Sequence, residues 1–241
     1  MKRWIANRVA GFLNRRGYAI TRPRFHEENP IDLRGLLAEP IQQRKGQFSV
    51  LQVGANDGIS NDPIHHLVVS RKWRLLAVEP MEGSFNRLVN TYRDNPHVRC
   101  VQCAVGATDG QAIMYSIDPQ GANGFDDHLS SFSLDVLKKH WRHIPDLSER
   151  VTTHAVKSLT LSSLMKENEF TDVDMLQIDT EGFDYEVIKM ALHCGLFPEI
   201  IAFEWEHLGK QAMWDCRCDL IKYGYKWLIT KGDVVAVRSI D

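Results

Sequence analysis

The decapeptide SVLQVGANDG at residues 49–58 decides the fold of this chain, because a short apolar run ends there in a glycine turn. Asn61, Asp62 and Pro63 follow the turn, and apolar residues at helical spacing come next. Asn61 or Asp62 can cap a helix, and a proline is tolerated in the first helical turn, where its missing N–H is not needed. The order of strand, glycine turn and helix is typical of α/β proteins that bind a nucleotide at the carboxyl end of a strand.

An acidic residue stands at the distance from this turn that a nucleoside site requires. Glu79 closes a second apolar run, 21 positions after Gly58 (79 − 58). Such an acid can accept hydrogen bonds from ribose hydroxyls. The glycine pattern is G-x-x-x-G, whereas a dinucleotide needs G-x-G-x-x-G so that the backbone can approach its pyrophosphate. The pattern therefore favours a nucleoside without phosphates, such as S-adenosylmethionine, although glycines at a strand end can also serve only to make a turn.

The bulk composition is that of an ordinary globular protein. The 241 residues are 44% hydrophobic and 25% charged, with a formal net charge of −2. This charge argues against nucleic acid as the partner, because phosphate binding usually needs a strongly basic face. No apolar run approaches the roughly 20 residues that span a bilayer, and the N-terminus lacks the apolar core of a signal peptide. We therefore expect a cytoplasmic protein.

The chain divides into an N-terminal segment at residues 1–46 and an α/β domain at residues 47–241. Residues 1–16 combine apolar residues at helical spacing with five basic residues, and no acid appears before Glu27. A basic amphipathic helix can lie on anionic lipid, here at the inner face of the membrane. The alternative is a helix that packs on the domain or on a partner subunit of a homo-oligomer.

Strand and helix patterns alternate through the domain, which predicts a wound parallel sheet. The expected elements are strands near 48–53, 74–79, 98–103, 173–179 and 198–204, helices near 63–71, 82–93, 183–193 and 209–223, and a closing hairpin at 225–230 and 233–238.

An insertion at residues 107–160 interrupts this alternation. It contains expected strands at 111–117 and 151–157, a polar loop at 118–128 and a helix at 134–143. An insertion of this length usually lies over the ligand end of the sheet as a lid or substrate wall, and the alternative is a surface elaboration. Within it, Asp126–Ser133 could reach the site with its hydroxyls and Phe132, although helix capping explains Ser131 and Ser133 equally well.

A second strand, residues 175–178, also ends in acids and a glycine. Asp179 and Glu181 should open on the same crevice as the first strand, because the carboxyl ends of parallel strands meet at one edge. A carboxylate there could accept a substrate proton, bind a divalent cation or neutralise part of a sulfonium charge. The alternative is that Asp179 caps a helix and Glu181 matches the helix dipole. Asp184 is interpreted as helix N-terminal charge.

The following strand delivers Glu204 and His207 to the same edge. A histidine of near-neutral pKa is a suitable base for a hydroxyl, and an acid beside it can orient the ring. Either residue could instead be a metal ligand, or both could be solvated side chains of an ordinary turn.

With these residues in view, the chain resembles the FkbM family of S-adenosylmethionine-dependent methyltransferases from about Val50 to Phe203. The matching pieces are residues 53–58, 78–80, 104–106 and 176–182, together with Glu204. The resemblance implies a Rossmann-like class I methyltransferase fold, with a mostly parallel seven-stranded sheet of order 3-2-1-4-5-7-6, helices on both faces and an antiparallel last strand. It implies Asp179 and Glu181 as site acids. It also implies a cofactor pocket formed by Gly54, Ala55, Asn56, Asp57, Gly58, Glu79, Pro80 and Ala104.

The resemblance further implies O-methylation of a hydroxyl on a small molecule, sugar or glycan. In-line transfer from the sulfonium needs mainly alignment and a base, for which His207 or Asp179 is the candidate, supported by Glu204 or Glu181. A divalent metal is possible. The competing hypotheses are a nicotinamide-dependent oxidoreductase or epimerase, which the missing G-x-G-x-x-G disfavours, and a non-catalytic nucleoside-binding subunit.

Overall fold

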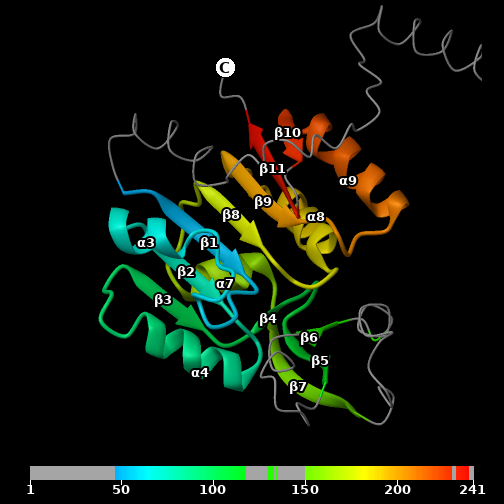
Figure 1. Cartoon of the computed structure of the whole chain (residues 1–241). Coiled ribbons are helices and arrows are strands. Elements are labelled where there is room, and N and C mark those ends of the chain that lie inside the picture. Colours follow the sequence, from blue (N-terminus) through cyan, green and yellow to red (C-terminus); the bar gives the residue numbers. More distant parts are fainter. Residues whose placement is uncertain (1–46, 118–129, 133, 135–149, 230–231, 239–241) are drawn as a thin grey trace, which may run out of the picture. The chain divides into compact units, whose positions relative to one another are not determined.

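The computed structural model describes residues 47–117, 130–132, 134, 150–229 and 232–238 (Figure 1). The predicted N-terminal segment at 1–46, the polar loop at 118–128 and the predicted helix beyond Leu134 lie outside these residues. Within the described ranges, no helix is both long enough and apolar enough to cross a membrane.

The main sheet has seven strands in the order β10-β11-β9-β8-β1-β2-β3. β11 runs antiparallel to both of its neighbours, and the other pairs are parallel. Numbered along the main sheet alone, this is the predicted order 3-2-1-4-5-7-6 with an antiparallel last strand, which is confirmed. The strands are β1 (Ser49–Val53), β2 (Arg74–Val78), β3 (Val98–Val101), β8 (Met175–Ile178), β9 (Ile200–Glu204), β10 (Tyr225–Ile229) and β11 (Asp233–Arg238).

The register aligns the carboxyl ends of the central strands. Val53, the last residue of β1, pairs with Val78 at the end of β2 and with Ile178 at the end of β8. Ile178 in turn pairs with Phe203 in β9. The polar residues that follow these strands therefore emerge side by side at one edge of the sheet.

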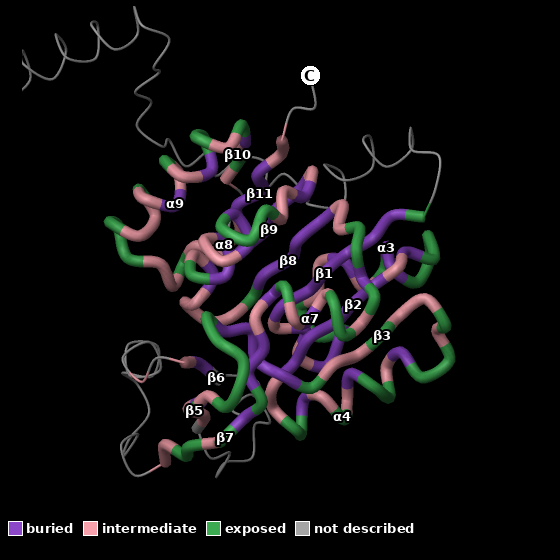
Figure 2. Tube along the Cα trace, turned by 180° about the vertical axis from the view of Figure 1, so that it is seen from behind, coloured by how far each residue is buried: buried purple, intermediate pink, exposed green. Residues whose placement is uncertain are grey.

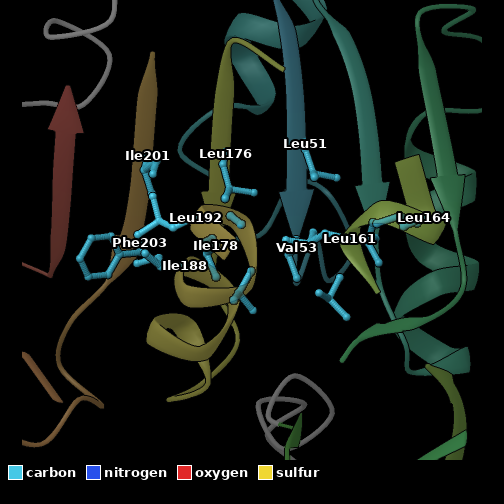
Figure 3. Packing of buried hydrophobic residues seen from close by; sticks show 14 of the residues in the cluster. Leu51, Val53, Leu161, Leu164, Leu176, Ile178, Ile188, Leu192, Ile201 and Phe203 are labelled. Atoms are coloured by element: carbon cyan, nitrogen blue, oxygen red, sulfur yellow. The ribbon is translucent and has the colours of Figure 1, made fainter. Parts of the chain in front are cut away.

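Helices cover both faces of the sheet, as predicted, because successive residues of each strand point to opposite sides. Val50 packs in the core that includes Val68 of α3 and Leu88 of α4, whereas Leu51 packs in the core beneath α7, α8 and α9 (Figure 3). The central strands are accordingly buried along their whole length (Figure 2). The helices are α3 (His65–Arg71), α4 (Glu82–Thr91), α7 (Leu161–Glu167), α8 (Asp184–His193) and α9 (Lys210–Lys222).

A second, four-stranded sheet with order β4-β7-β5-β6 lies beyond the carboxyl ends of β1 and β2 (Figure 1). Its strands are β4 (Ala104–Val105), β5 (Gly110–Ile117), β6 (Ser130–Ser131) and β7 (Val151–Leu159). The strand predicted near residues 98–103 is confirmed as β3, but it ends at Val101, because the chain leaves the main sheet there and joins the second sheet at Ala104. The predicted strands within the insertion are confirmed as β5 and β7.

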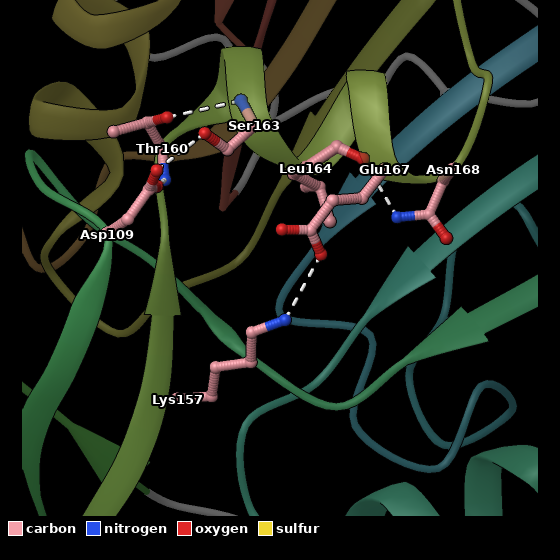
Figure 4. A network of polar contacts seen from close by, with 7 residues as sticks. All are labelled: Asp109, Lys157, Thr160, Ser163, Leu164, Glu167 and Asn168. Carbon is pink, nitrogen blue, oxygen red and sulfur yellow. Dashed lines mark hydrogen bonds and ion pairs between the residues drawn. The ribbon is translucent and has the colours of Figure 1, made fainter.

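Polar contacts fix this second sheet to α7, a helix that the sequence did not predict (Figure 4). The carboxylate of Asp109 accepts hydrogen bonds from the Thr160 backbone N–H at 2.7 Å and the Ser163 hydroxyl at 2.6 Å. The Thr160 hydroxyl accepts from the Ser163 N–H and so caps the helix. Lys157 reaches Glu167 at 3.1 Å. These contacts link β5 and β7 of the second sheet to the start and end of α7.

Candidate active site

A pocket lies where β1, β2 and β8 end, with the second sheet as its far wall. Its lining includes three acids, Glu79, Asp179 and Glu181. Apolar residues from the second sheet and the segment after it, namely Val105, Met114 and Phe132, face them. The pocket thus combines an acidic rim on the main sheet with an apolar wall, which suits a ligand that carries both a flat ring and a cation. Other predicted cofactor residues that line it are Gly54, Asn56, Pro80 and Ala104.

Glu79 joins the turns that follow β1 and β2. Its Oε2 accepts a hydrogen bond from the Asn56 N–H at 3.0 Å, and its Oε1 accepts one from the Met81 N–H at 2.9 Å. Burial raises the pKa of Glu79 to about 7, although both hydrogen bonds favour the charged form. Each carboxylate oxygen keeps a second lone pair, so the group can still accept hydrogen bonds from a ligand's hydroxyls.

Gly54 lets the turn after β1 touch the end of β8. It adopts a φ of +83°, and a Cβ added there would lie 1.7 Å from the carbonyl oxygen of Asp179. Only glycine fits so close an approach in this backbone conformation.

Three predicted cofactor residues do not line the pocket. Ala55 is buried in the core beside α3 and α4, and Gly58 faces Tyr92. The carboxylate of Asp57 accepts hydrogen bonds from the N–H groups of Ile59 and Ser60 and from the Ser60 hydroxyl, at 2.6–2.9 Å. Asp57 is therefore turned into its own loop, where it holds the shape of the turn, and the expectation that it surrounds the pocket with Glu79 and Asp179 is corrected.

Asp179 and Glu181 follow β8 directly, and both face the pocket. The strand ends at Ile178 rather than continuing, and Glu181 has a φ of +51°, so a turn rather than period-two alternation brings the two acids together. The Asp179 side chain is accessible, but the surface that it exposes belongs to the pocket. Burial among protein groups, together with the charges of Glu181 and Glu204, raises the pKa of Asp179 well above its usual range.

Asp184 plays the structural part expected of it. It is fully buried at the start of α8, where its Oδ2 accepts hydrogen bonds from the Thr180 hydroxyl at 3.0 Å and the Gly182 N–H at 3.2 Å. These bonds shape the turn that presents Asp179 and Glu181.

Glu204 and His207 meet Glu181 beside the pocket, as the sequence predicted. Nε2 of His207 lies 3.0 Å from Oε2 of Glu204 and 3.2 Å from Oε2 of Glu181. Burial opposes charging of the imidazole, but the hydrogen bond with Glu204 and the field of both acids outweigh it and raise the pKa of His207. Burial raises the pKa of Glu181 to about 7, against the opposite effect of His207.

The segment around Phe132 reaches the site, which was one of the two alternatives that the sequence left open for it. Ser131 donates a hydrogen bond from its hydroxyl to the carbonyl oxygen of Glu181 at 3.0 Å, so it braces the acid turn instead of capping a helix. The ring of Phe132 packs 4.7 Å from that of Phe183. Met114 and Ser84 also line the pocket and were missed, because an apolar residue in a strand and a serine in a helix carry no distinguishing local signal.

The titration of Glu79 predicts how cofactor binding depends on pH. If Glu79 binds the ribose of a cofactor, its ionised carboxylate would accept hydrogen bonds from the ribose hydroxyls, and protonation would remove the charge and turn one acceptor oxygen into a donor, so affinity should be highest above the pKa of about 7 and fall as the pH drops below it. Titration of this single carboxyl group predicts that S-adenosylhomocysteine binds about tenfold more weakly at pH 6 than at pH 8, which calorimetry can measure. Glu79→Gln should bind weakly with a flat profile, and the exposed neighbour variant Glu82→Gln should behave as wild type. An unchanged profile in Glu79→Gln would assign the titration to another acid.

Comparisons with known proteins agree with this architecture. The model of the methyltransferase FkbM domain family matches residues 52–226. No curated protein matches the chain. A crystal structure of methyltransferase FkbM from Methylobacillus flagellatus KT superposes with a TM-score of 0.50 at 13% identity, over 81% of this chain and 45% of that one. At this identity the likeness shows the fold alone.

Two other solved structures superpose less well. The METTL16 MTase domain gives a TM-score of 0.49 at 12% identity, over 84% of this chain and 63% of that one. Aeropyrum pernix fibrillarin, solved with natively bound S-adenosyl-L-methionine, gives a TM-score of 0.40 at 12% identity, over 80% of this chain and 67% of that one. This chain thus spans less than two thirds of the Methylobacillus protein and of the METTL16 domain.

Proposed function

The chain belongs to the FkbM family of methyltransferases, and from this premise we propose that it transfers the methyl group of S-adenosylmethionine to a hydroxyl oxygen of a sugar, a glycan or a related small molecule. The single observation that carries the proposal is the pocket at the ends of β1, β2 and β8. There Glu79, Asp179 and Glu181 line one cavity, which supports a ribose site at the buried Glu79 and a site for the sulfonium end at the other two acids. The apolar wall of Val105 and Met114 suits the adenine ring.

The cofactor fits the residues that are present. Glu79 would accept hydrogen bonds from the ribose hydroxyls, and Ala104 leaves room for a flat base against the second sheet. When bound, S-adenosylmethionine supplies an activated methyl group, and the contribution of the protein is to align the acceptor oxygen with the carbon and sulfur.

Asp179 is the residue best placed to take the hydroxyl proton. Its carboxyl is accessible within the pocket, and its raised pKa makes it a stronger base than an ordinary aspartate. His207 is the weaker candidate, because its Nε2 is already engaged by the carboxylates of Glu181 and Glu204, at 3.2 Å and 3.0 Å. Asp179 would hold the proton that the acceptor hydroxyl loses, and the bound cofactor would supply the methyl group that the oxygen gains and would leave as S-adenosylhomocysteine.

The polar mouth formed by Glu181, Glu204 and His207 supports a hydroxyl-rich acceptor. These groups lie beside the acid end of the cofactor pocket. Polar side chains in such a position select a substrate whose own groups can form hydrogen bonds with them. An apolar acceptor would shield the exposed parts of Glu181 and Glu204 from water without returning a hydrogen bond, which costs free energy.

The decisive experiment is a two-stage assay on the full chain. We expect S-adenosylhomocysteine at 100 times its Kd to stabilise the fold by about 2.7 kcal/mol in thermal unfolding, with no shift from nicotinamide dinucleotides. Labelled S-adenosylmethionine should then methylate members of a panel of sugars and glycans, with the new methyl on oxygen by mass spectrometry and NMR. A shift with a nicotinamide cofactor alone would support the oxidoreductase alternative, and methylation of nitrogen only would refute the O-methyl assignment.

A further inference from the structure

Three side chains that can bind a metal ion, two glutamates and a histidine, converge beside the cofactor pocket. Glu181 follows β8, Glu204 ends β9, and His207 lies three residues further along the chain. One donor atom of each lies within 4.8 Å of the other two, which no other trio of histidine, cysteine or acidic residues achieves among the residues that the structure describes. The convergence needs two different strand ends, so it is a product of the fold and not of local sequence.

The cluster has more acceptors than protons. Nε2 of a histidine carries at most one hydrogen, yet oxygens of Glu204 and Glu181 both face it, at 3.0 Å and 3.2 Å. Among the residues that the structure describes, Oε2 of Glu181 and Oε2 of Glu204 are buried atoms without a hydrogen-bond donor that meets full geometry, and so is Oδ1 of the nearby, completely buried Asp184, whose charge acts on both Glu181 and His207. Buried carboxylate oxygens without donors are costly, and a cation among them would remove that cost.

The spacing of the donor atoms matches a coordination shell. Ligands about 2.1 Å from one ion lie about 3.0 Å apart at octahedral angles and about 3.4 Å apart at tetrahedral angles. The two measured separations, 3.0 Å and 3.2 Å, fall in this interval. The third separation, between the two carboxylates, is within 4.8 Å, so the rotation of one carboxylate would bring all three donors onto one ion.

The donor set selects the kind of ion. Magnesium and calcium prefer oxygen ligands alone, whereas imidazole suits zinc and iron, and carboxylates suit manganese. We propose that Glu181, Glu204 and His207 bind one divalent first-row transition-metal ion, with Mn²⁺, Fe²⁺ or Zn²⁺ as the fitting candidates.

Such an ion would bind the acceptor hydroxyl in the proposed methyl transfer. This role of the ion rests on the proposed function. Three protein ligands leave coordination positions open, and a hydroxyl bound at one of them becomes more acidic. Glu181 lines the same pocket as Asp179, so a hydroxyl held by the ion would lie near the base that takes its proton.

The test measures ion binding without cofactor or acceptor. The full chain is freed of metals with a chelator, and Mn²⁺ binding is followed by electron paramagnetic resonance and Zn²⁺ binding by calorimetry. We expect one ion per chain, an affinity at least 10-fold lower in Glu204→Gln and in Glu181→Gln, and unchanged affinity in Glu206→Gln. Glu206 is an exposed acid two positions from Glu204 and provides the matched control. Circular dichroism confirms folding, and the second of the two cluster variants serves if the first does not fold.

The outcomes separate this proposal from the proposed function. A wild-type chain that binds neither ion at millimolar concentration, or cluster variants that bind as wild type does, would overturn the metal site. S-adenosylhomocysteine binding is measured on the same samples. If the nucleoside binds and the metals do not, methyl transfer stands without an ion. If the metals bind and the nucleoside does not, the ion site stands and the proposed methyl transfer fails.

Discussion

Gly54→Ala should leave the chain unable to bind S-adenosylhomocysteine and should destabilise the fold by more than about 3 kcal/mol, the upper range for a single strained or overpacked position. The added Cβ would lie 1.7 Å from the Asp179 carbonyl oxygen, and backbone is the least adjustable partner for such a clash. Neither backbone segment can move away easily, because each is held by a hydrogen bond to a neighbouring strand. The Gly54 N–H donates to the Val78 carbonyl at 3.0 Å, and the Asp179 N–H donates to the Val53 carbonyl at 2.9 Å.

Urea unfolding and calorimetry with S-adenosylhomocysteine check this expectation, and Gly83→Ala provides the matched control. A Cβ at Gly83 would meet only the Arg87 side chain, at 3.8 Å, an ordinary contact. Gly83 lies in the first turn of α4, where alanine is the better helix former, so this control should be neutral or stabilised by up to about 1 kcal/mol. A Gly54→Ala chain that binds the nucleoside with wild-type affinity would show that the β1 turn does not need its close approach to β8.

The strand ends that build the site were predictable because each is marked locally. Val53, Val78 and Ile178 all end short apolar runs that are followed at once by glycine or acids, and such runs are typical of strands buried on both faces. Once those strands are taken as parallel and adjacent, Glu79, Asp179, Glu181 and Glu204 must emerge at one edge. The resemblance to a known family added the strand order, which local patterns alone do not determine.

The remaining features depend on contacts that no local pattern encodes. β5 pairs with β7 across a gap in sequence of more than 30 residues, and this pairing alone brings Met114 to the pocket. Asp57 shows that a residue of the right type at the right position in the sequence can still fail to line the site. Its type and position suit a ligand, but its carboxylate is satisfied by three donors of its own turn, and a sequence does not reveal which donors an acid will find.

Asp179→Asn should lower the turnover of methyl transfer by about 10²- to 10⁴-fold, the usual contribution of a general base. The amide keeps the size of the side chain but has no carboxylate to accept the hydroxyl proton. Affinity for S-adenosylhomocysteine should change little, because the ribose is held by Glu79 and the nucleoside product carries no sulfonium charge. The measurements are turnover with labelled S-adenosylmethionine and calorimetry with S-adenosylhomocysteine.

Asp172→Asn is the control for this substitution, because Asp172 is an exposed acid in the segment that leads into β8 and lies outside the pocket lining. It should turn over as wild type does. A pH profile separates a base from a residue that only positions the acceptor. At saturating S-adenosylmethionine, where the titration of Glu79 no longer affects the rate, the turnover of the wild type should rise with pH as Asp179 ionises, because its raised pKa keeps a fraction of the carboxyl protonated at lower pH, and Asp179→Asn should lose that rise. A variant that turns over slowly but keeps the rise would make Asp179 a positioning residue and return the role of base to the His207 cluster.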